Sequence, residues 1–552
     1  MSNNKDFGVL YGQKTTEDYL LIYSGYEDAK SSPSLGDFIV LSPSKEEGTK
    51  YLARIDAEVY DEDPIFKSQD KTLIAVHYSR IAQRELSDRD KQKMFSYTYK
   101  VKILGTFISQ GIGMLKFTTA VRKLPTVSYM ARHLYQDEVL HILNSANSTG
   151  VPIGYLCIGE DIQDEKGYML FDINKLRSSR SMVFARSGYG KTNFIKVLMH
   201  EMIKNTTFGK LIFDLNGEYF VKGDKTYGFG DLDTNYIKNN FVVYTDRDIP
   251  SEYDNNFINE GKVKLDMKNN LTADDILSTA TGLSELMKSF LLYLSEQGVT
   301  DFIKKIDYYT NSPGALHQDF PDFFEKPKVD KSGEVKDTSA RRTIGAIRKR
   351  IQHLIDENGS LHSSSSKLLD NVFHHLRNGR TVVIDLSLKD ETDAAIIANI
   401  ITKKLFLTNK SNFTSSNNSG IINTVIFVEE AQNVLSDDFV KSNSNPFVKV
   451  AKEGRKFGLG LVAITQRPSA ISEEIRTQAE NFFTFHLGNT DDIRALVKSN
   501  INYDGVISKF IQNETIKGNL YMVSADQSFA LPIRVLNFEE SVSNLVYPHL
   551  KL

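Results

Sequence analysis

The stretch that most constrains this chain is residues 181–192, which read Ser-Met-Val-Phe-Ala-Arg-Ser-Gly-Tyr-Gly-Lys-Thr. A short apolar run gives way to a turn with two glycines, and residues 193–202 then follow with the apolar spacing of a helix. A strand, a glycine-bearing loop and a helix in this order are typical of a phosphate-binding loop. The backbone N–H groups of such a loop point inward, and the helix presents its positive N-terminal end to a polyphosphate.

The residue types within this loop predict separate contacts to ATP and Mg²⁺. Lys191 is expected to reach the β- and γ-phosphates, and the Thr192 hydroxyl is expected to bind Mg²⁺. We expect further nucleotide contacts from the rest of the loop and the first turn of the helix, namely Arg186, Ser187, Gly188, Tyr189, Gly190 and Asn193.

The loop departs from the usual pattern at its first position, where Ala185 replaces glycine. The turn can still form if residue 185 keeps a negative φ, because that region is open to alanine as well as glycine. The alternative is a chance Gly-x-Gly-Lys-Thr run at the start of a helix.

Composition and charge narrow the class of protein. With 552 residues, of which 40% are hydrophobic and 25% charged, the chain is expected to form two or three soluble globular domains. A net charge of −3 argues against a protein that simply coats DNA, but it leaves open a DNA motor whose positive charge is confined to a channel. The single cysteine, Cys157, excludes an internal disulfide and fits a cytoplasmic protein. We expect no membrane segment or signal peptide, since no apolar run reaches about 18 residues.

The first 135 residues read as a small β-barrel. Short apolar or alternating runs at 19–23, 37–41, 51–55, 99–105 and 114–118 are separated by Gly, Pro and Ser turns. Several short strands at such spacing favour a barrel. A polar cluster at 145–150 marks a candidate domain boundary.

From residue 151 onward the pattern alternates between strands and helices, which predicts an α/β domain with a parallel sheet covered on both faces. The expected strands lie at 182–185, 210–213, 241–244, 381–385, 424–428, 460–465 and 482–486. Between about 250 and 375 the strand signal vanishes, and helices are expected at 283–296 and 340–356 on either side of a polar stretch at 326–339. The predicted division is a barrel at 1–135, a core at 150–250 and 376–540, a helical insertion at 251–375 and a tail at 541–552.

Two adjacent carboxylates, Glu429 and Glu430, follow the apolar run at 421–428. In an open α/β sheet, ligands sit outside the carboxyl ends of the strands, so both acids are expected beside the phosphates. One would help to place Mg²⁺ and the other would polarise the attacking water. We favour Glu430 as the water activator and Glu429 as the metal-side residue, although the sequence hardly separates them. The alternative is a solvated pair at the start of the next helix, where the dipole favours acids.

Other polar residues also flank predicted strands. Asp214 follows the strand at 210–213 and is a second Mg²⁺ candidate, with a turn-capping aspartate as the alternative. Gln466 follows the strand at 460–465 and is expected to sense the γ-phosphate, and Arg467 beside it is expected to contact the nucleotide. Arg455 precedes that strand, so it would reach a neighbouring subunit's nucleotide as an arginine finger. For both arginines the alternative is an ordinary surface ion pair.

Taken together, the runs at 188–192, 214–219, 428–432, 453–458 and 465–469 resemble the motifs of the HerA branch of the HerA/FtsK ATPases, and the N-terminal strands resemble that family's small barrel. The chain departs from the pattern at Ala185, Tyr189 and Gln432. The resemblance implies a RecA-like P-loop core in a hexameric ring that hydrolyses ATP and moves along double-stranded DNA. It also implies a separate nuclease or other effector as partner, in DNA end processing or antiphage defence.

Two other functions stay open on the sequence. One is an ATP-gated ring scaffold that assembles and licenses an effector with little net translocation. The other is a metabolic phosphotransferase, for which we find no small-molecule acceptor pocket in the sequence. The DNA-contacting residues are not visible, and 437–445, with Lys441 as its only cation, is one candidate loop.

Overall fold

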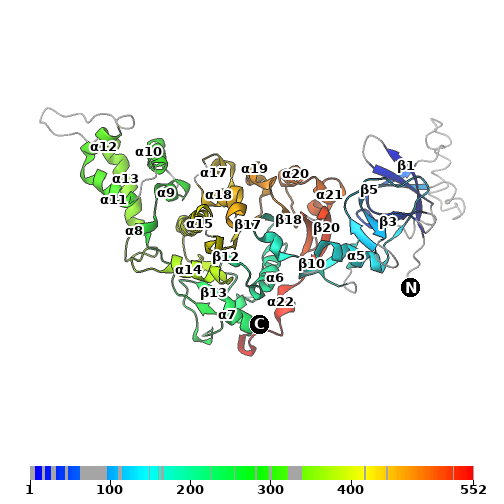
Figure 1. Cartoon of the computed structure of the whole chain (residues 1–552), viewed down its shortest axis with the longest axis horizontal. Helices are drawn as coiled ribbons and strands as arrows, with labels where there is room; N and C mark the ends of the chain where they lie inside the picture. Colours follow the sequence, from blue (N-terminus) through cyan, green and yellow to red (C-terminus); the bar gives the residue numbers. More distant parts are fainter. Residues whose placement is uncertain are drawn as a thin grey trace, which may run out of the picture. The chain divides into compact units, whose positions relative to one another are not determined.

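The chain folds into two compact units. The computed structural model describes residues 6–14, 19–25, 33–43, 48–61, 96–109, 115–147, 150–158, 161–162, 167–223, 226–253, 255–279, 283–297, 301–320, 339–415, 418–442, 445–525 and 527–550. The first unit comprises residues 1–173, 184–194 and 481–536, and the second comprises 174–183, 195–480 and 537–552 (Figure 1). Among the helices described, none is long and apolar enough to cross a membrane.

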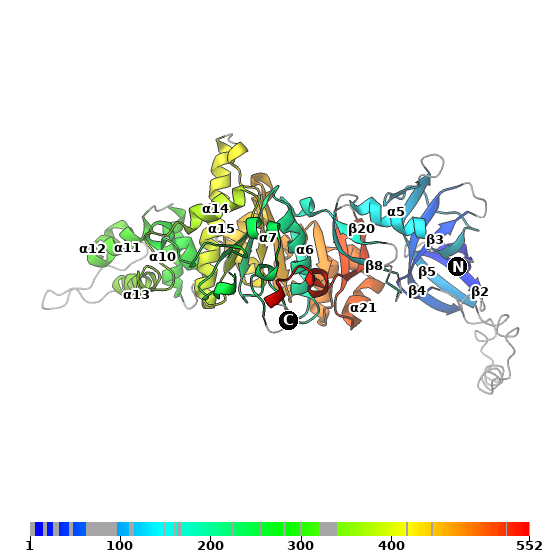
Figure 2. The same cartoon turned by 90° about the horizontal axis from the view of Figure 1, so that it is seen from below.

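The first unit begins with a closed antiparallel barrel (blue in Figure 2). Its strands are β1 (Gly8–Lys14), β2 (Tyr19–Gly25), β3 (Phe38–Ser42), β4 (Lys50–Asp61), β5 (Ser96–Ser109), β6 (Leu115–Thr118) and β7 (Met130–His133). They pair in the order β2-β1-β7-β3-β4-β5-β6, and a further pairing of β2 with β5 closes the circle. Inward side chains such as Ile22, Ile39 and Val101 are fully buried. The predicted barrel is therefore confirmed.

The rest of the first unit contains antiparallel strands that the sequence analysis missed. They are β8 (Val151–Ile158), β9 (Asp161–Ile162), β10 (Met169–Phe171), β18 (Asn481–Thr484), β19 (Asn519–Ser524) and β20 (Gln527–Val535). Their order is β10-β8-β20-β19-β18, with β9 paired to β8. Of these, only β18 was expected. The expectation of a purely parallel sheet is wrong here, because Pro152 and Gly154 in β8 and Pro532 in β20 disguise the strand pattern. The helices of this unit are α5 (Gln136–Asn147), α20 (Thr490–Ser499) and α21 (Val506–Asn513).

The second unit is built on a largely parallel sheet. Its strands are β11 (Arg180–Phe184, of which the first four residues belong to this unit), β12 (Gly209–Asp214), β13 (Phe241–Tyr244), β14 (Ile258–Asn259), β15 (Thr381–Asp385), β16 (Thr424–Val428) and β17 (Leu459–Thr465). The order is β11-β17-β16-β12-β15-β13-β14, and the pairs from β17 to β14 are parallel. Every residue of β12, β15, β16 and β17 is buried, as expected for strands covered on both faces. The predicted α/β class is confirmed.

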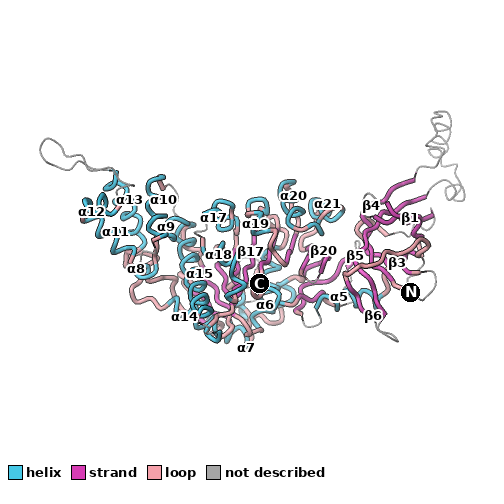
Figure 3. Tube along the Cα trace, turned by 45° about the horizontal axis from the view of Figure 1, so that its top comes forward, coloured by secondary structure: helices cyan, strands magenta, loops and turns pink. Residues whose placement is uncertain are grey.

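Helices connect and cover these strands (cyan in Figure 3). They are α6 (Lys191–Lys204), α7 (Asn235–Asn240), α14 (Leu368–Arg377), α15 (Glu391–Thr414), α16 (Gln432–Leu435), α17 (Asp437–Ser442), α18 (Pro446–Glu453), α19 (Glu473–Arg476) and α22 (Phe538–Val542). Helix α14 packs on β12 and β15, and α18 packs on β17 and α15. Residues 437–442 of the candidate DNA-contacting loop are helical, and Lys441 is exposed on α17.

The insertion forms a helical cluster with an aromatic centre. Its helices are α8 (Met267–Asn270), α9 (Ala273–Thr279), α10 (Glu285–Glu296), α11 (Phe302–Asn311), α12 (Pro313–Asp319) and α13 (Ser339–Leu354). The Phe320 ring lies 5.1 Å from the Phe290 ring and 5.4 Å from the Tyr309 ring, between centroids. The two helices predicted at 283–296 and 340–356 are confirmed as α10 and α13. Most of the predicted polar stretch at 326–339 lies outside the described residues.

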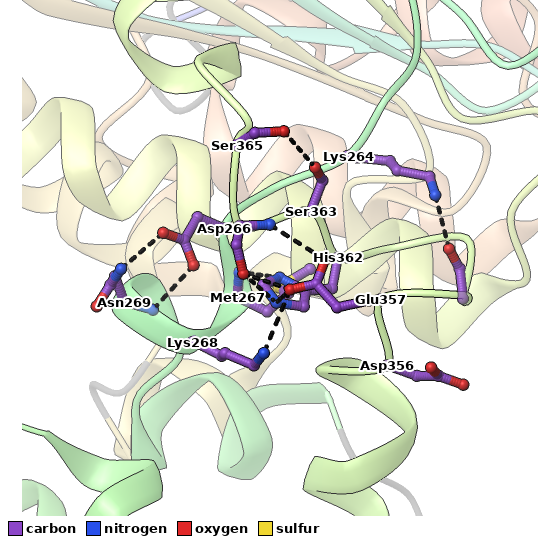
Figure 4. Close-up of polar contacts among 12 residues, drawn as sticks. Lys264, Asp266, Met267, Lys268, Asn269, Asp356, Glu357, His362, Ser363 and Ser365 are labelled. Atoms are coloured by element: carbon purple, nitrogen blue, oxygen red, sulfur yellow. Dashed lines mark hydrogen bonds and ion pairs between the residues drawn. The ribbon is translucent and has the colours of Figure 1, made fainter.

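The base of the insertion is tied together around a buried histidine, His362 (Figure 4). His362 forms an isolated β-bridge with Leu265, and its ring nitrogens lie 3.1 Å from the Met267 N–H nitrogen and 3.1 Å from Glu357 Oε1. The Ser364 hydroxyl, which donates to Glu357, lowers the pKa of that carboxyl to about 2, with Lys268 assisting. This bridge and the short strand β14 correct the expectation that the segment from 250 to 375 holds no strand pairing.

A buried ion pair joins the barrel to α5 and gives a stability test. Arg132 on β7 donates to both Glu138 oxygens, at 2.9 and 2.6 Å, and the two side chains are 4% and 0% exposed. We expect Glu138→Gln to destabilise the first unit by about 3 kcal/mol or more, because it leaves a buried guanidinium without its countercharge. The measurement is the urea midpoint by circular dichroism, since the chain has no tryptophan.

The matched control for this test is Asp491→Asn, which breaks the exposed pair of Asp491 with Arg494 in the same unit. Exposed pairs contribute little, so its midpoint should stay at the wild-type value. An equal shift in both variants would contradict a special contribution from the buried pair.

Candidate active site

The predicted phosphate loop lies between β11 and α6, and its turn rests on two glycines. Gly188 and Gly190 have φ values of +82° and +104°, a region that side chains rarely adopt. Ala185 is buried and is absent from the described non-glycine residues with positive φ. The expectation that alanine fits the first position is confirmed.

Backbone contacts from neighbouring segments of the first unit hold this loop. The Arg186 N–H donates to the His486 carbonyl at 2.9 Å, and the Gly518 N–H donates to the Tyr189 carbonyl at 3.2 Å. The Tyr189 ring packs on the His486 ring with 4.3 Å between centroids. The Tyr189 side chain, larger than the residue usual at this position, therefore packs beside the loop and does not obstruct its turn.

The start of α6 places the remaining loop residues. Lys191 and Thr192 stand in the first turn of α6, where backbone N–H groups lack helical partners, and both are half-buried. Ser187 is exposed, together with its neighbours Arg186 and Gly188. The Asn193 amide donates to the Leu536 carbonyl at 2.8 Å, so this side chain has a structural partner in addition to its expected contact with the nucleotide.

The two predicted carboxylates after β16 occupy different surroundings in the second unit. Glu429 is 5% exposed, and its carboxylate accepts hydrogen bonds from the Tyr219 hydroxyl at 2.7 Å and the Asn216 amide at 3.4 Å. Glu430 is half-buried and has a φ of +46°, an unusual conformation for this residue type. Backbone conformations of this kind persist where the surroundings impose them, and they gather at functional sites.

Side-chain amides connect Glu430 to the end of β17. Gln432 donates to Glu430 Oε2 at 2.7 Å, and Gln466 approaches Glu430 Oε1 at 3.3 Å. The Thr465 hydroxyl in turn donates to the Gln432 amide oxygen at 2.5 Å. Gln466 therefore lies beside one of the predicted acids. The sequence showed Gln432 only as a departure from the family pattern, and the structure makes it a neighbour of Glu430.

The Asp214 carboxylate caps the backbone that follows it. Its two oxygens accept hydrogen bonds from the N–H groups of residues 216, 217, 218 and 219, at 2.7 to 3.2 Å. Burial raises the pKa of Asp214 to about 6, and the nearby Asp385 charge adds to the rise. This geometry favours the turn-capping alternative that the sequence left open.

The two candidate arginines are exposed. The Arg467 N–H donates to the Thr465 hydroxyl at 3.0 Å, at the same end of β17 as Gln466. Arg455 lies before β17, its side chain 75% exposed, and pairs with Glu480 at 3.1 Å. Since β17 has seven residues, its ends lie about 20 Å apart at the usual rise. Arg455 is thus remote from Glu429 and Glu430 of the same chain, and its contact with Glu480 matches the alternative noted above, an ordinary surface ion pair.

Residues that the sequence analysis did not single out also shape the site. Tyr219 and Asn216 contact Glu429, although more than 200 positions separate them from it in the sequence. Arg247 contacts the loop that contains Asn216 and Tyr219, through the Gly217 carbonyl. No sequence signal identifies these contacts, since each depends on which strands are neighbours. Among the residues described, no group of three or more His, Cys, Asp or Glu side chains gathers as a metal site. The Thr192 hydroxyl and the Glu429 carboxylate, which the sequence predicts as Mg²⁺ ligands, offer oxygen atoms, the ligand type that Mg²⁺ prefers.

Comparison with known proteins finds a helicase family model and helicase relatives. The family model described as helicase HerA, central domain, matches residues 156–405, which include the phosphate loop and Asp214. A second model, zonular occludens toxin, matches residues 341–492. The DNA double-strand break repair helicase HerA of Sulfurisphaera tokodaii is 25% identical over 69% of this chain and 67% of its own length. A probable helicase of Methanocaldococcus jannaschii is 22% identical over 87% of this chain and 81% of its own length.

Two solved structures are also similar. VirB4 of Thermoanaerobacter pseudethanolicus has a TM-score of 0.42 at 13% identity, covering 73% of this chain and 98% of that chain. The plasmid coupling protein TrwB in complex with ADP and Mg²⁺ has a TM-score of 0.41 at 12% identity, covering 67% and 87%. The sequence matches, and the P-loop and α/β core described above, carry the assignment. By these sequence matches the chain is similar to HerA helicases, and it has the phosphate loop and α/β core of a P-loop ATPase.

Proposed function

We propose that this ATPase is a hexameric HerA-type translocase or helicase of double-stranded DNA that works with a separate nuclease or other effector. The observation that carries the proposal is which functional residues follow which strands. A glycine-bearing phosphate loop follows β11 in the first unit; in the second unit Gln466 follows β17, and Glu429 and Glu430 follow its neighbour β16. A motor core needs all three elements, namely the phosphate loop, the acids and the polar residue after a neighbouring strand.

The loop and the acids have complementary roles in this proposal. Lys191 would neutralise phosphate charge on ATP, and Thr192 and Glu429 would supply oxygen ligands to Mg²⁺. When bound, Mg²⁺ withdraws charge from the phosphates. Glu430 accepts the proton of the attacking water at its carboxylate. Gln466 touches Glu430, which supports its role as the residue that relates the γ-phosphate to the base.

The DNA, the ring and the partner rest on the relatives. Several relatives are named as DNA double-strand break repair helicases, which supports duplex DNA as the track. A net charge of −3 is compatible with DNA-binding charge that is confined to a channel. We keep the domain division given above, a cytoplasmic location and a role in end processing or antiphage defence as parts of the proposal.

The experiment that tests this function compares ATP hydrolysis by the isolated chain with and without double-stranded DNA. Stimulation by DNA alone supports the translocase. Stimulation that appears only with a co-purified effector supports the ATP-gated scaffold instead. Native mass measurement of the same sample reports whether a hexamer is present.

Lys191→Ala tests the phosphate loop. We expect it to abolish ATP hydrolysis, because it removes the main countercharge for the β- and γ-phosphates. The measurement is steady-state phosphate release. The control is Lys204→Ala in the last turn of the same helix, where Lys204 pairs with Glu201 at 2.6 Å on the surface, and it should retain activity. Normal turnover by Lys191→Ala would remove the basis of the site.

Glu430→Gln separates binding from chemistry. The change keeps size and hydrogen bonding but removes the base, so ATP should still bind while hydrolysis falls by about 10²-fold or more. Equilibrium binding of ATP and single-turnover hydrolysis are measured on the same preparation. The comparison variant is Glu429→Gln. If that variant loses the chemical step and Glu430→Gln does not, the two carboxylates have exchanged roles.

Arg455→Ala tests the arginine finger. In related phosphoryl-transfer systems such an arginine contributes roughly 10³-fold or more to turnover. We expect Arg455→Ala to be inactive alone and to regain part of its activity when mixed with Lys191→Ala subunits. Such mixing creates interfaces with one intact loop and one intact arginine.

The control for the finger is Arg494→Ala, which removes an equally exposed arginine, 76% accessible, from a surface pair. It should hydrolyse ATP at the wild-type rate. Full turnover by Arg455→Ala as a stable hexamer would rule out the finger.

A further inference from the structure

The loop that follows β12, Leu215–Phe220, is fixed from several sides. We call it the 215–220 loop. Asp214 caps it through the four backbone N–H groups described above. A carboxylate that is 0% exposed and fully hydrogen-bonded to one loop leaves that backbone little freedom. The loop therefore has one defined shape beside the acids.

Arg247 clamps the same loop from the β13 side. Its guanidinium donates to the Gly217 carbonyl at 3.0 Å and stacks on the Phe220 ring at 3.9 Å from the centroid. Gly217 has a φ of +70°, and a Cβ atom there would lie 2.8 Å from the guanidinium. The glycine is required for this close approach, so the clamp and the loop are fitted to each other.

Asp385 at the end of β15 anchors the clamp. It accepts a hydrogen bond from Arg247 Nε at 3.0 Å and from the Thr245 hydroxyl at 2.5 Å, and its side chain is 1% exposed. The Arg247 N–H also donates to the Thr245 hydroxyl at 3.0 Å. Residues that follow β13, together with the last residue of β15, thereby set the position of a loop that follows β12.

Two residues of the 215–220 loop contact Glu429 of the candidate site. Tyr219 is 0% exposed, and its hydroxyl donates to Glu429 at 2.7 Å, while Asn216 reaches the other oxygen at 3.4 Å. A carboxylate that must act on a metal or a water has to be held within about 0.5 Å of its working position. Both donors to Glu429 named here come from the 215–220 loop.

We propose that Tyr219 and Arg247 are positioning residues for Glu429. Arg247, anchored on Asp385, holds the 215–220 loop, and Tyr219 and Asn216 carry that placement to the carboxylate. The inference rests on the proposed function, because it takes Glu429 to work in the ATP site.

Tyr219→Phe is the first variant, because it removes one hydroxyl and keeps the buried ring. We measure the affinity for ADP with and without MgCl₂ by calorimetry, and the single-turnover rate with ATP. We expect the gain in ADP affinity from Mg²⁺, or the single-turnover rate, to fall by about tenfold, as for the loss of one hydrogen bond to a charged group. ADP affinity without Mg²⁺ should not change.

The control is Tyr503→Phe. This tyrosine is also 0% exposed, and its hydroxyl donates to the Tyr521 carbonyl at 2.9 Å, in the other unit. The control should keep both quantities at wild-type values. An equal loss in both variants would mean that any buried tyrosine hydroxyl matters, and it would overturn the inference.

A double-mutant cycle with Glu429→Gln decides whether Tyr219 acts through Glu429. Residues that act through a shared partner are not additive. We expect Tyr219→Phe to have little further effect in the Glu429→Gln background. An undiminished effect there, or no effect of Tyr219→Phe in the wild-type background, would overturn the inference.

Arg247→Lys extends the test to the clamp while keeping the charge. Lysine cannot hold Asp385 and the Gly217 carbonyl with one planar group, so the variant should show the Tyr219→Phe defect. Its control is Arg348→Lys, since Arg348 pairs with Asp307 at 3.1 Å in the insertion. A wild-type result for Arg247→Lys would exclude the clamp.

Lys191→Ala separates this inference from the proposed function. If Lys191→Ala is inactive while Tyr219→Phe matches its control, only the positioning inference fails. If Lys191→Ala hydrolyses ATP normally, the site itself is wrong.

Discussion

The buried parallel strands impose the constraint on which the rest of the structure depends. Strands β12, β15, β16 and β17 bury every residue, so their interiors have no room for polar chemistry. Charged groups can stand only at the strand ends, where the backbone leaves the sheet. Asp214, Asp385, Glu429 and Gln466 all occupy such positions, at or just after the last residue of a strand, and the proposed active site draws on them.

Much of the sheet was predictable from the sequence, because buried strands appear there as runs of apolar residues. The runs at 241–244, 381–385 and 424–428 became β13, β15 and β16 with the expected bounds. The antiparallel strands β8 and β20 were missed, since proline interrupts their pattern. Local propensity also cannot show that Glu430 takes a positive φ, which depends on the packing around it.

Contacts across the sheet account for what the sequence could not show. Tyr219 and Glu429 meet because β12 and β16 are neighbours, although 210 positions separate them. Gln432 departs from the family pattern, and its side-chain amide donates a hydrogen bond to Glu430. In the same way, Tyr189 replaces a small residue in the phosphate loop and packs on His486. Each of these two side chains has a contact partner in this chain, so neither departure from the family pattern implies a disrupted site.

The fit between Gly217 and Arg247 restricts how this chain can vary. A side chain at 217 would enter the space of the guanidinium, whereas a shorter residue at 247 would leave the Asp385 charge and the Gly217 carbonyl without their donor. A single substitution at either position therefore carries a cost, and at 217 the positive φ strains any side chain whatever residue stands at 247. Grafting the 215–220 loop into a relative would accordingly require moving residue 247 and its aspartate as well.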